Sequence, residues 1–241
     1  IILIVLLLVF IFWNINSGSI SISLNDIFQI LFHKNGDETA YNIVWEIRLP
    51  RILAAVILGG ALSVSGFLLQ TFFGNPIAGP FVLGISSGAK LIVALTMIYL
   101  LGKSMVATSG LMILAAFTGS LISMGFVLLI SRKVKQMSML VVSGIMIGYI
   151  CSAITDFVVT FADDSNIVNL HNWSLGSFSG TSWDNVSVMA VVVFAALFLT
   201  FLMSKPISAY QLGEGYAQNM GVNIKAFRIA LILLSSILSA C

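Results

Sequence analysis

Charged side chains are scarce in this sequence. They make up 8% of the 241 residues, whereas hydrophobic residues make up 59%, and an ordinary soluble domain has roughly a quarter of its residues charged. A soluble protein of this composition would have too little polar surface to meet water. In lipid, only helices or closed barrels satisfy the backbone amides. The apolar runs are about 20 residues long and unbroken, which favours helices over a barrel. The composition therefore predicts an all-α polytopic membrane protein.

Residues suited to catalysis or metal binding are equally few. The two cysteines, Cys151 and Cys241, lie in apolar runs and are interpreted as packing residues. The two histidines, His33 and His171, stand apart in predicted outer loops, so no convergent set of catalytic or ligating side chains is visible. A net charge of +2 is too small to indicate the basic surface of a nucleic-acid-binding protein. We therefore expect no catalytic residue, metal site, cofactor or nucleic-acid partner in this chain.

Seven apolar runs are predicted to span the bilayer, with the third short and the last incomplete. They lie near Ile1–Trp13, Ile52–Gln70, Ala89–Leu101, Val106–Ser131, Met139–Phe161, Val186–Met203 and Phe227–Cys241. The sequence starts without methionine and stops inside an apolar run. We therefore interpret residues 1–241 as a single transmembrane domain that is truncated at both ends.

Basic residues in the loops set the orientation of the chain. With the first helix running outward, most loop cations fall inside, namely Arg132, Lys133, Lys135, Lys205, Lys225 and Arg228. Most acidic residues fall outside. We expect the chain to start inside and the seventh predicted helix to run outward.

Two cations lie on the unexpected side of this layout. Arg48 and Arg51 bracket Pro50 at the outer end of the second predicted span. They are either interfacial anchors that reach the lipid headgroups or a basic patch for an acidic partner on the outer face.

The inside loop 206–226 is too long for a simple turn. Within it, Leu212–Gly221 predicts a short helix that ends at a glycine. A short helix held between two spans offers a docking site for a cytosolic partner.

Small residues recur at every fourth position of the fifth predicted span. Gly144, Gly148 and Ser152 form this stripe, and the next position along it is Asp156. Such stripes usually pack helices together in lipid. A carboxylate on the stripe would face protein or a water-filled path, because exposure to hydrocarbon is costly. Asp156 is therefore either a satisfied carboxylate near the helix end or part of a substrate path.

Four motifs follow one another between residues 48 and 89. They are Arg-Leu-Pro-Arg (48–51), Gly-Ala-Leu-Ser-Val-Ser-Gly (60–66), Gly-Asn-Pro-Ile-Ala-Gly-Pro (74–80) and Leu-Gly-Ile-Ser-Ser-Gly-Ala (83–89). In this order and spacing they strongly resemble the FecCD-type permease family, the membrane subunits of ABC importers for iron–siderophores, haem and vitamin B12. Segments 142–148, 173–178 and 212–222 resemble the same family.

This resemblance implies the type II ABC importer permease fold of ten spanning helices, about seven of them in this chain. It implies a homodimer or heterodimer of permeases in the cytoplasmic membrane of a bacterium, two cytosolic ATPases and an extracytoplasmic substrate-binding protein. ATP hydrolysis would belong to the ATPases. The implied cargo is a metal chelate, with a ferric siderophore or haem favoured and vitamin B12 as the alternative.

The resemblance also implies roles for individual residues. Arg48 and Arg51 would dock the binding protein. The ATPases would act on the loop 206–226 through Leu212, Gly213, Glu214, Ala217 and Gly221. Met137 and Ser138 would belong to the cytoplasmic gate. The pathway candidates on the fifth span are Gly144, Gly148, Ser152 and Asp156.

Two other functions are compatible with the residues alone. One is a secondary transporter driven by an ion gradient, with Asp156 as the coupling carboxylate, although no internal repeat is visible. The other is a membrane scaffold without transport, which would leave the patterned loop 206–226 without a purpose.

Overall fold

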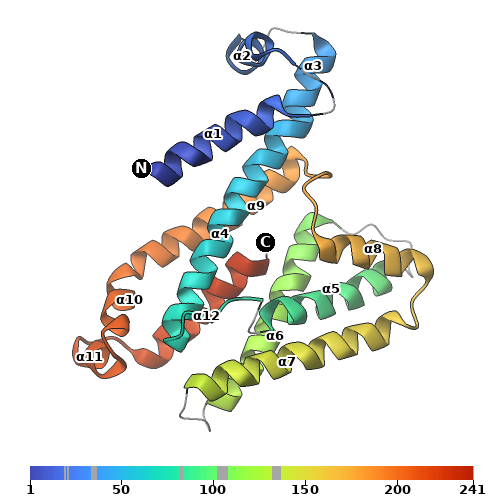
Figure 1. The fold of residues 1–241 in the computed structure, drawn as a ribbon. Coiled ribbons are helices and arrows are strands. Elements are labelled where there is room, and N and C mark those ends of the chain that lie inside the picture. Colours follow the sequence, from blue (N-terminus) through green and yellow to red (C-terminus); the bar gives the residue numbers. More distant parts are fainter. Residues whose placement is uncertain are drawn as a thin grey trace. The chain divides into compact units, whose positions relative to one another are not determined.

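The computed structural model describes residues 1–18, 20, 22–33, 37–81, 84–101, 108–131 and 137–240. All regular secondary structure in these ranges is helical (Figure 1). The chain forms two compact units, one of Ile1–Ile57 with Ser177–Ala190 and the other of Leu58–Gly176 with Val191–Cys241. Helices α4 (Leu49–Phe73) and α9 (Trp183–Leu202) each contribute residues to both units.

The first unit is built from four short or medium helices. They are α1 (Ile2–Asn16), α2 (Leu24–His33), α3 (Glu38–Asn42) and the π-helix η1 (Ile43–Arg48), joined by the first residues of α4 and α9. Branched apolar side chains form the core, namely Ile15, Ile22, Ile27, Ile30, Val44 and Ile52. Burying these side chains fixes α2 and η1 against the end of α1.

Pro50 follows the π-helix η1 and leaves one of its carbonyls without a helical partner. Proline has no N–H and cannot donate a helical hydrogen bond. In the π register hydrogen bonds reach back five residues, as the Leu49 N–H does to the Val44 carbonyl. The Trp45 carbonyl would then receive the missing N–H of Pro50, and it instead accepts from Trp183 Nε1 at 2.9 Å. The start of α9 is thereby fastened to η1.

The helical run through Pro50 is longer than the predicted second span. The sequence predicts that this span starts at Ile52, whereas the structure continues the helix back to Glu38, over 36 residues. Segment 38–51 contains charged residues and therefore gave no signal of hydrophobicity. Its helix is stabilised by the core of the first unit and by the Trp183 hydrogen bond.

The second unit contains most of the apolar helices. They are α5 (Ile85–Leu101), α6 (Ser109–Ser131), α7 (Met137–Val159) and α8 (Asp164–Leu175), followed by α10 (Ser204–Gln211), α11 (Glu214–Asn219) and α12 (Ile224–Ala240). Helix α5 packs against α6 and α7, and α12 packs against α6. One buried cluster in this unit consists mainly of small residues, namely Ala89, Val93, Ala115, Ala116 and Ala240.

Glycines bring the backbones of α5, α6 and α7 into direct contact. A Cβ on Gly88 would lie 2.6 Å from the Gly119 carbonyl oxygen, and a Cβ on Gly84 would lie 2.7 Å from the Gly148 nitrogen. Ser123 Oγ donates to the Gly84 carbonyl at 2.9 Å. Close approach of this kind is how helices associate in lipid, where apolar burial gives no driving force. The glycines therefore determine the packing of this bundle.

Four stretches of the described chain are long and apolar enough to cross a membrane. They are Glu38–Phe73, Gly110–Ile130, Met139–Val159 and Trp183–Leu202. Helix α1 and residues Ile85–Tyr99 are apolar but shorter. Each of the seven predicted spans coincides with a helix. That α1, α5 and α12 also cross the bilayer stays a prediction.

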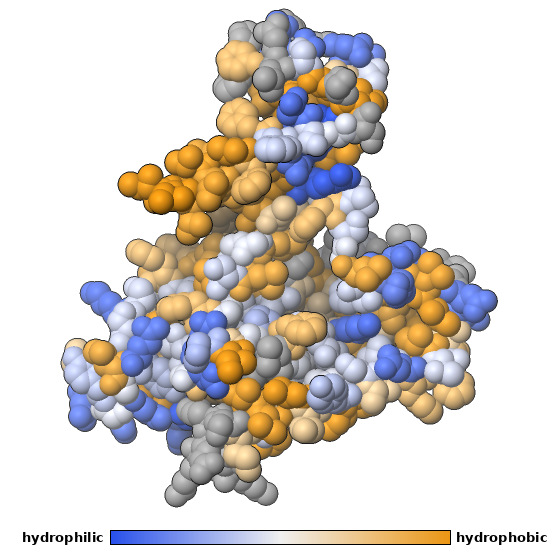
Figure 2. All heavy atoms as spheres, viewed as in Figure 1, coloured by the Kyte–Doolittle hydropathy of each residue, from blue (hydrophilic) through white to orange (hydrophobic). Residues whose placement is uncertain are grey.

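Figure 2 shows the contrast between apolar and polar helices. Hydrophobic residues cover α1 along its length, and hydrophilic residues gather around α10 and α11. Leu3 and Trp13 of α1 are 80% and 68% exposed, as expected for a helix in contact with lipid or with another membrane helix. Helices α2, α3, α8 and α10 lie in segments predicted as loops, because none has a long apolar run.

Candidate functional site

The segment between α9 and α12 folds into two short helices. Helix α10 ends at Gln211, Gly213 at φ 127° precedes α11 (Glu214–Asn219), and Gly221 at φ 86° follows it. Positive φ values of this kind strain residues with a Cβ. The Val222 N–H closes the C-terminus of α11 on the Ala217 carbonyl at 3.0 Å. The predicted short helix with a glycine stop is confirmed, and α10 is an addition to it.

Most of the predicted coupling residues have internal contacts in this segment. The Ala217 side chain is 0% exposed, and Gly213 and Gly221 form the two turns. Glu214 accepts a hydrogen bond from Arg228. Leu212, by contrast, is 73% exposed. Of the five residues, Ala217 alone is buried, and Leu212 and Glu214 have side chains that a partner could contact.

Two further exposed apolar residues, one in α11 and one directly after it, were missed by the sequence analysis. Tyr216 and Met220 are 49% and 65% exposed, and they lie one helical turn apart on one flank of α11. Glu214 and Gln218 occupy the other flank at the same spacing. The sequence pattern could have indicated this apolar flank once Ala217 was known to face inward.

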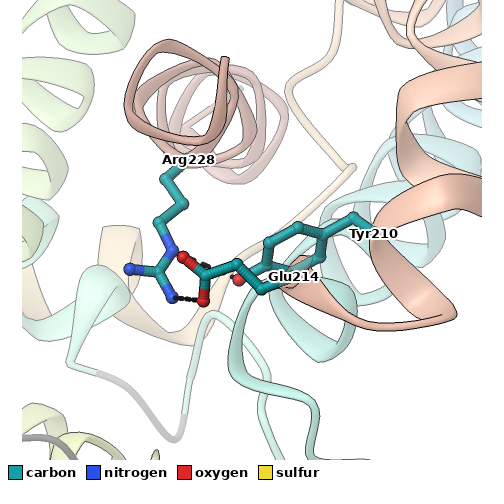
Figure 3. A network of polar contacts seen from close by, with 3 residues as sticks. All are labelled: Tyr210, Glu214 and Arg228. Atoms are coloured by element: carbon teal, nitrogen blue, oxygen red, sulfur yellow. Dashed lines mark hydrogen bonds and ion pairs between the residues drawn. The ribbon is translucent and has the colours of Figure 1, made fainter. Parts of the chain in front are cut away.

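A polar network connects α11 with its neighbours (Figure 3). Arg228 Nη2 of α12 donates to Glu214 Oε2 at 2.9 Å, and Arg228 Nε donates to the Tyr210 hydroxyl of α10 at 3.2 Å. Beside this contact is a hollow of about 570 Å³ that is lined by Gln218, Asn223 and Lys225 among others. Helix α11 is therefore held to α12 by a few specific contacts instead of by continuous packing.

Arg48 is a buried residue of the first unit. It is 8% exposed, and its guanidinium donates to the Ile15 carbonyl at 2.5 Å and to the Ile20 carbonyl at 2.6 Å. Gly18 leaves room for it, because a Cβ there would overlap the guanidinium. The interfacial-anchor interpretation does not describe this arginine, which instead ties η1 to the connection after α1.

Arg51 binds a different segment of the same unit. Its guanidinium donates to the Phe178 carbonyl at 3.3 Å and to the Ser179 carbonyl at 3.5 Å. Both contacts are exposed and long. An apolar hollow of about 300 Å³ adjoins it, lined by Phe10, Ile52 and Val56 among others. Of the two arginines, Arg51 is the one with a guanidinium accessible to a partner.

The pathway candidates of α7 divide into packed and exposed residues. Gly148 contacts the backbone of Gly84, and Ser152 Oγ donates to Ser87 Oγ at 3.4 Å. Gly144 is buried, and its carbonyl lies beside Gly84. Asp156 is exposed. Three of the four candidates thus contribute to the contact between α5 and α7, and Asp156 remains as the polar candidate.

Met137 and Ser138 start α7, and their side chains lie outside the described part, as does Cys241. In the described ranges, no three His, Cys, Asp or Glu residues gather into a group that could hold a metal ion.

Comparisons with known proteins identify relatives along the whole chain. Residues 6–241 match the FecCD transport family. The chain is 32% identical over 237 residues to the hemin transport system permease protein HmuU of Yersinia pestis, covering 98% of this chain and 70% of that protein. It is 36% identical over 191 residues to the vitamin B12 import system permease protein BtuC of Klebsiella pneumoniae, covering 79% of this chain and 56% of that protein.

A solved structure shares the fold. It is named for an inward-facing, metal-chelate type ABC transporter and superposes with a TM-score of 0.81 at 24% sequence identity. The match covers 99% of this chain and 72% of the solved chain. The chain therefore has the helical fold of that solved chain.

Proposed function

Because the chain belongs to the FecCD transport family, we propose that it is a permease subunit of an ATP-driven ABC importer for a metal chelate. A ferric siderophore or haem is the favoured cargo, and vitamin B12 is the alternative within the class. The hemin and vitamin B12 permeases among the relatives support this range of substrates. Membership of a transport family also supports a chain that moves cargo and leaves ATP hydrolysis to a partner.

The observation that carries the proposal is the short helix α11 with its exposed apolar residues. It lies between α10 and α12 and is bounded by two glycine turns. Tyr216 of α11 and Leu212 and Met220 beside it are exposed. Exposed apolar residues on a polar segment are typical of a protein-binding surface. We propose that this surface, hereafter the α11 apolar flank, receives a cytosolic ATPase, and that a second permease subunit presents an equivalent helix to a second ATPase.

In the proposed mechanism, ATP binding draws the two ATPases together and pulls on α11 in each permease. The two permease subunits then rock relative to each other, while a substrate-binding protein covers the outer side of the cytoplasmic membrane. Only differential contacts of the ATPases in the two states can drive such a change. We propose that the ATPases transmit their movement to this chain through the α11 apolar flank.

Introducing charge into the α11 apolar flank tests this function. In the double variant Tyr216→Glu with Met220→Glu, we expect co-purification of the ATPase to fall at least about tenfold, because two carboxylates would be desolvated at the contact. ATP-dependent uptake of labelled haem, ferric siderophore or vitamin B12, whichever the unmodified transporter carries, should fall in parallel. Affinity purification followed by vesicle uptake measures both.

Gln218→Glu is the matched control, because it adds a charge to the opposite flank of the same helix. It should leave co-purification within about twofold of the unmodified protein. If the double variant retained its ATPase and its uptake, α11 would not be the ATPase contact and the proposed function would lose its structural support.

An ion-gradient-driven transporter is the second candidate function, and one observation favours it. Asp156 is an exposed carboxylate on α7, within the apolar stretch Met139–Val159, where carboxylates are usually functional. If Asp156 couples transport to protons, Asp156→Asn should reduce uptake at least about tenfold and should abolish its dependence on a pH gradient. Unchanged uptake in vesicles would remove Asp156 from the transport path. Asp184→Asn serves as the control, because it changes an exposed carboxylate in the first turn of α9.

A further inference from the structure

We infer that Arg228 is a positioning residue that locks α11 onto the ends of α4 and α12, so that these three helices move as one body. The inference deepens the proposed function, because it says how a pull on α11 reaches the membrane-embedded helices. It rests on contacts within the second unit.

Helix α11 cannot hold its own position. It has six residues, Glu214–Asn219, which is too few for a helix that is stable in isolation. Its two flanking glycines adopt positive φ values, so α11 does not continue the helix of α10 or of α12. The direction of α11 is therefore determined by the side-chain contacts that fasten it.

The side chain of Arg228 makes the central contact with three other elements. It donates to Glu214 of α11 at 2.9 Å and to Tyr210 of α10 at 3.2 Å. Its guanidinium also lies over the ring of Phe72, near the end of α4, with 5.9 Å to the ring centroid. Charge, hydrogen bonding and the cation–π contact all favour the same rotamer of this arginine.

Neighbouring contacts restrict the same region. Gln211 Nε2 donates to Thr71 Oγ1 at 3.2 Å, which joins α10 to α4. The Tyr210 ring packs against Phe227, with 5.1 Å between ring centroids. These contacts hold α10, but α11 itself depends on buried Ala217 and on the Arg228–Glu214 ion pair. Breaking that pair would leave one flank of α11 facing only the solvent-accessible hollow.

Helices α4 and α12 are joined a second time, deeper in the bundle. Ser65 and Ser235 are both fully buried, and their hydroxyls lie 2.9 Å apart. Phe72 lies seven positions after Ser65 on α4, and Ser235 lies seven positions after Arg228 on α12. Two levels of contact, about 10 Å apart along both helices, resist rotation of one helix against the other. Motion delivered to α11 is thereby passed to α4 and α12 together.

Hydrogen exchange of the purified permease measures the locking directly. In Arg228→Gln, we expect the hydrogen-bonded amides of residues 217–222 to exchange about three- to tenfold faster, because local opening of α11 becomes easier. Lys225→Gln removes an exposed cation from the same helix and should leave exchange unchanged. The double variant Glu214→Arg with Arg228→Glu should restore slow exchange, because the Tyr210 hydroxyl can donate to a carboxylate at position 228.

The same variants in the assembled transporter measure the transmission. Arg228→Gln should keep its ATPase and continue to hydrolyse ATP while moving at least about threefold less cargo per ATP, and the charge-swapped double variant should recover. The inference would be overturned if Arg228→Gln changed neither the hydrogen exchange of α11 nor the amount of cargo moved per ATP. So would faster exchange that the charge swap fails to reverse. A chain that binds no ATPase at all would refute the proposed function, whereas the exchange data would still decide whether Arg228 locks α11.

Discussion

Gly119→Ala in α6 is expected to lower the stability of the helix bundle by about 1–3 kcal/mol or more, the usual cost of overpacking a filled contact. An added Cβ would overlap the Gly88 carbonyl oxygen and would lie 2.9 Å from Ala89 Cα. Both neighbours are backbone atoms of α5, so no side chain can rotate away. The helices would have to separate, which would also disturb the Ser123 hydrogen bond to Gly84. Thermal unfolding of the purified permease in detergent measures the change.

Gly125→Ala on the same helix is the matched control. A Cβ at Gly125 meets no atom within 4 Å, and alanine is favoured over glycine in a helix by up to about 1 kcal/mol. This variant should therefore be neutral or slightly stabilising. If Gly119→Ala were equally harmless, the backbone contact between α5 and α6 would not exist in the membrane.

Arg48→Met is expected to destabilise the first unit strongly. Methionine keeps most of the length of the side chain but none of its donors, so the Ile15 and Ile20 carbonyls lose their partners. An acceptor left unsatisfied in a buried position costs about 1–3 kcal/mol. We expect a lower midpoint of thermal unfolding and faster proteolysis near residues 15–22. Limited proteolysis with mass spectrometry locates the opened segment.

Arg51→Met separates a structural role from a docking role. The contacts of Arg51 with Phe178 and Ser179 are exposed and 3.3–3.5 Å long, so their loss should change stability by less than about 1 kcal/mol. Under the proposed function, the variant should weaken binding of the substrate-binding protein at least about tenfold while the ATPase still co-purifies. A normally stable Arg48→Met variant with the same loss of docking would instead make Arg48 a contact residue.

The two arginines show where inference from a sequence reached its limit. Their position beside Pro50 identified them as unusual, and the family resemblance gave both the same role. The structure distinguishes them by their hydrogen bonds. Arg48 donates to the carbonyls of residues 15 and 20, and Arg51 donates to the carbonyls of residues 178 and 179. Neither set of partners leaves a pattern in the sequence, since any residue can supply a backbone carbonyl.

The sequence located the short helix of the predicted coupling segment correctly. Which of its residues are buried and which are exposed became clear only from the fold. Two glycines and a polar run are enough to predict a short helix between two spans. Which side of that helix faces outward depends on where Ala217 packs and on the Arg228–Glu214 pair. The ion pair requires that α12 lies beside α11, and the position of α12 is set by the tertiary structure.

The scarcity of charged residues was the feature of the sequence that said most about the fold of this protein. It indicated a membrane protein, in which backbone amides must find partners within helices or a closed barrel. The long unbroken apolar runs favoured helices, and the ordered motifs at 48–89 indicated the family. The tertiary structure decided which small residues and which polar residues act together. Gly88 meets Gly119, Trp183 supplies the hydrogen bond that Pro50 cannot, and Arg228 reaches Glu214 and Tyr210. These pairs lie far apart in the chain or on different helices, and packing alone brings them within contact distance.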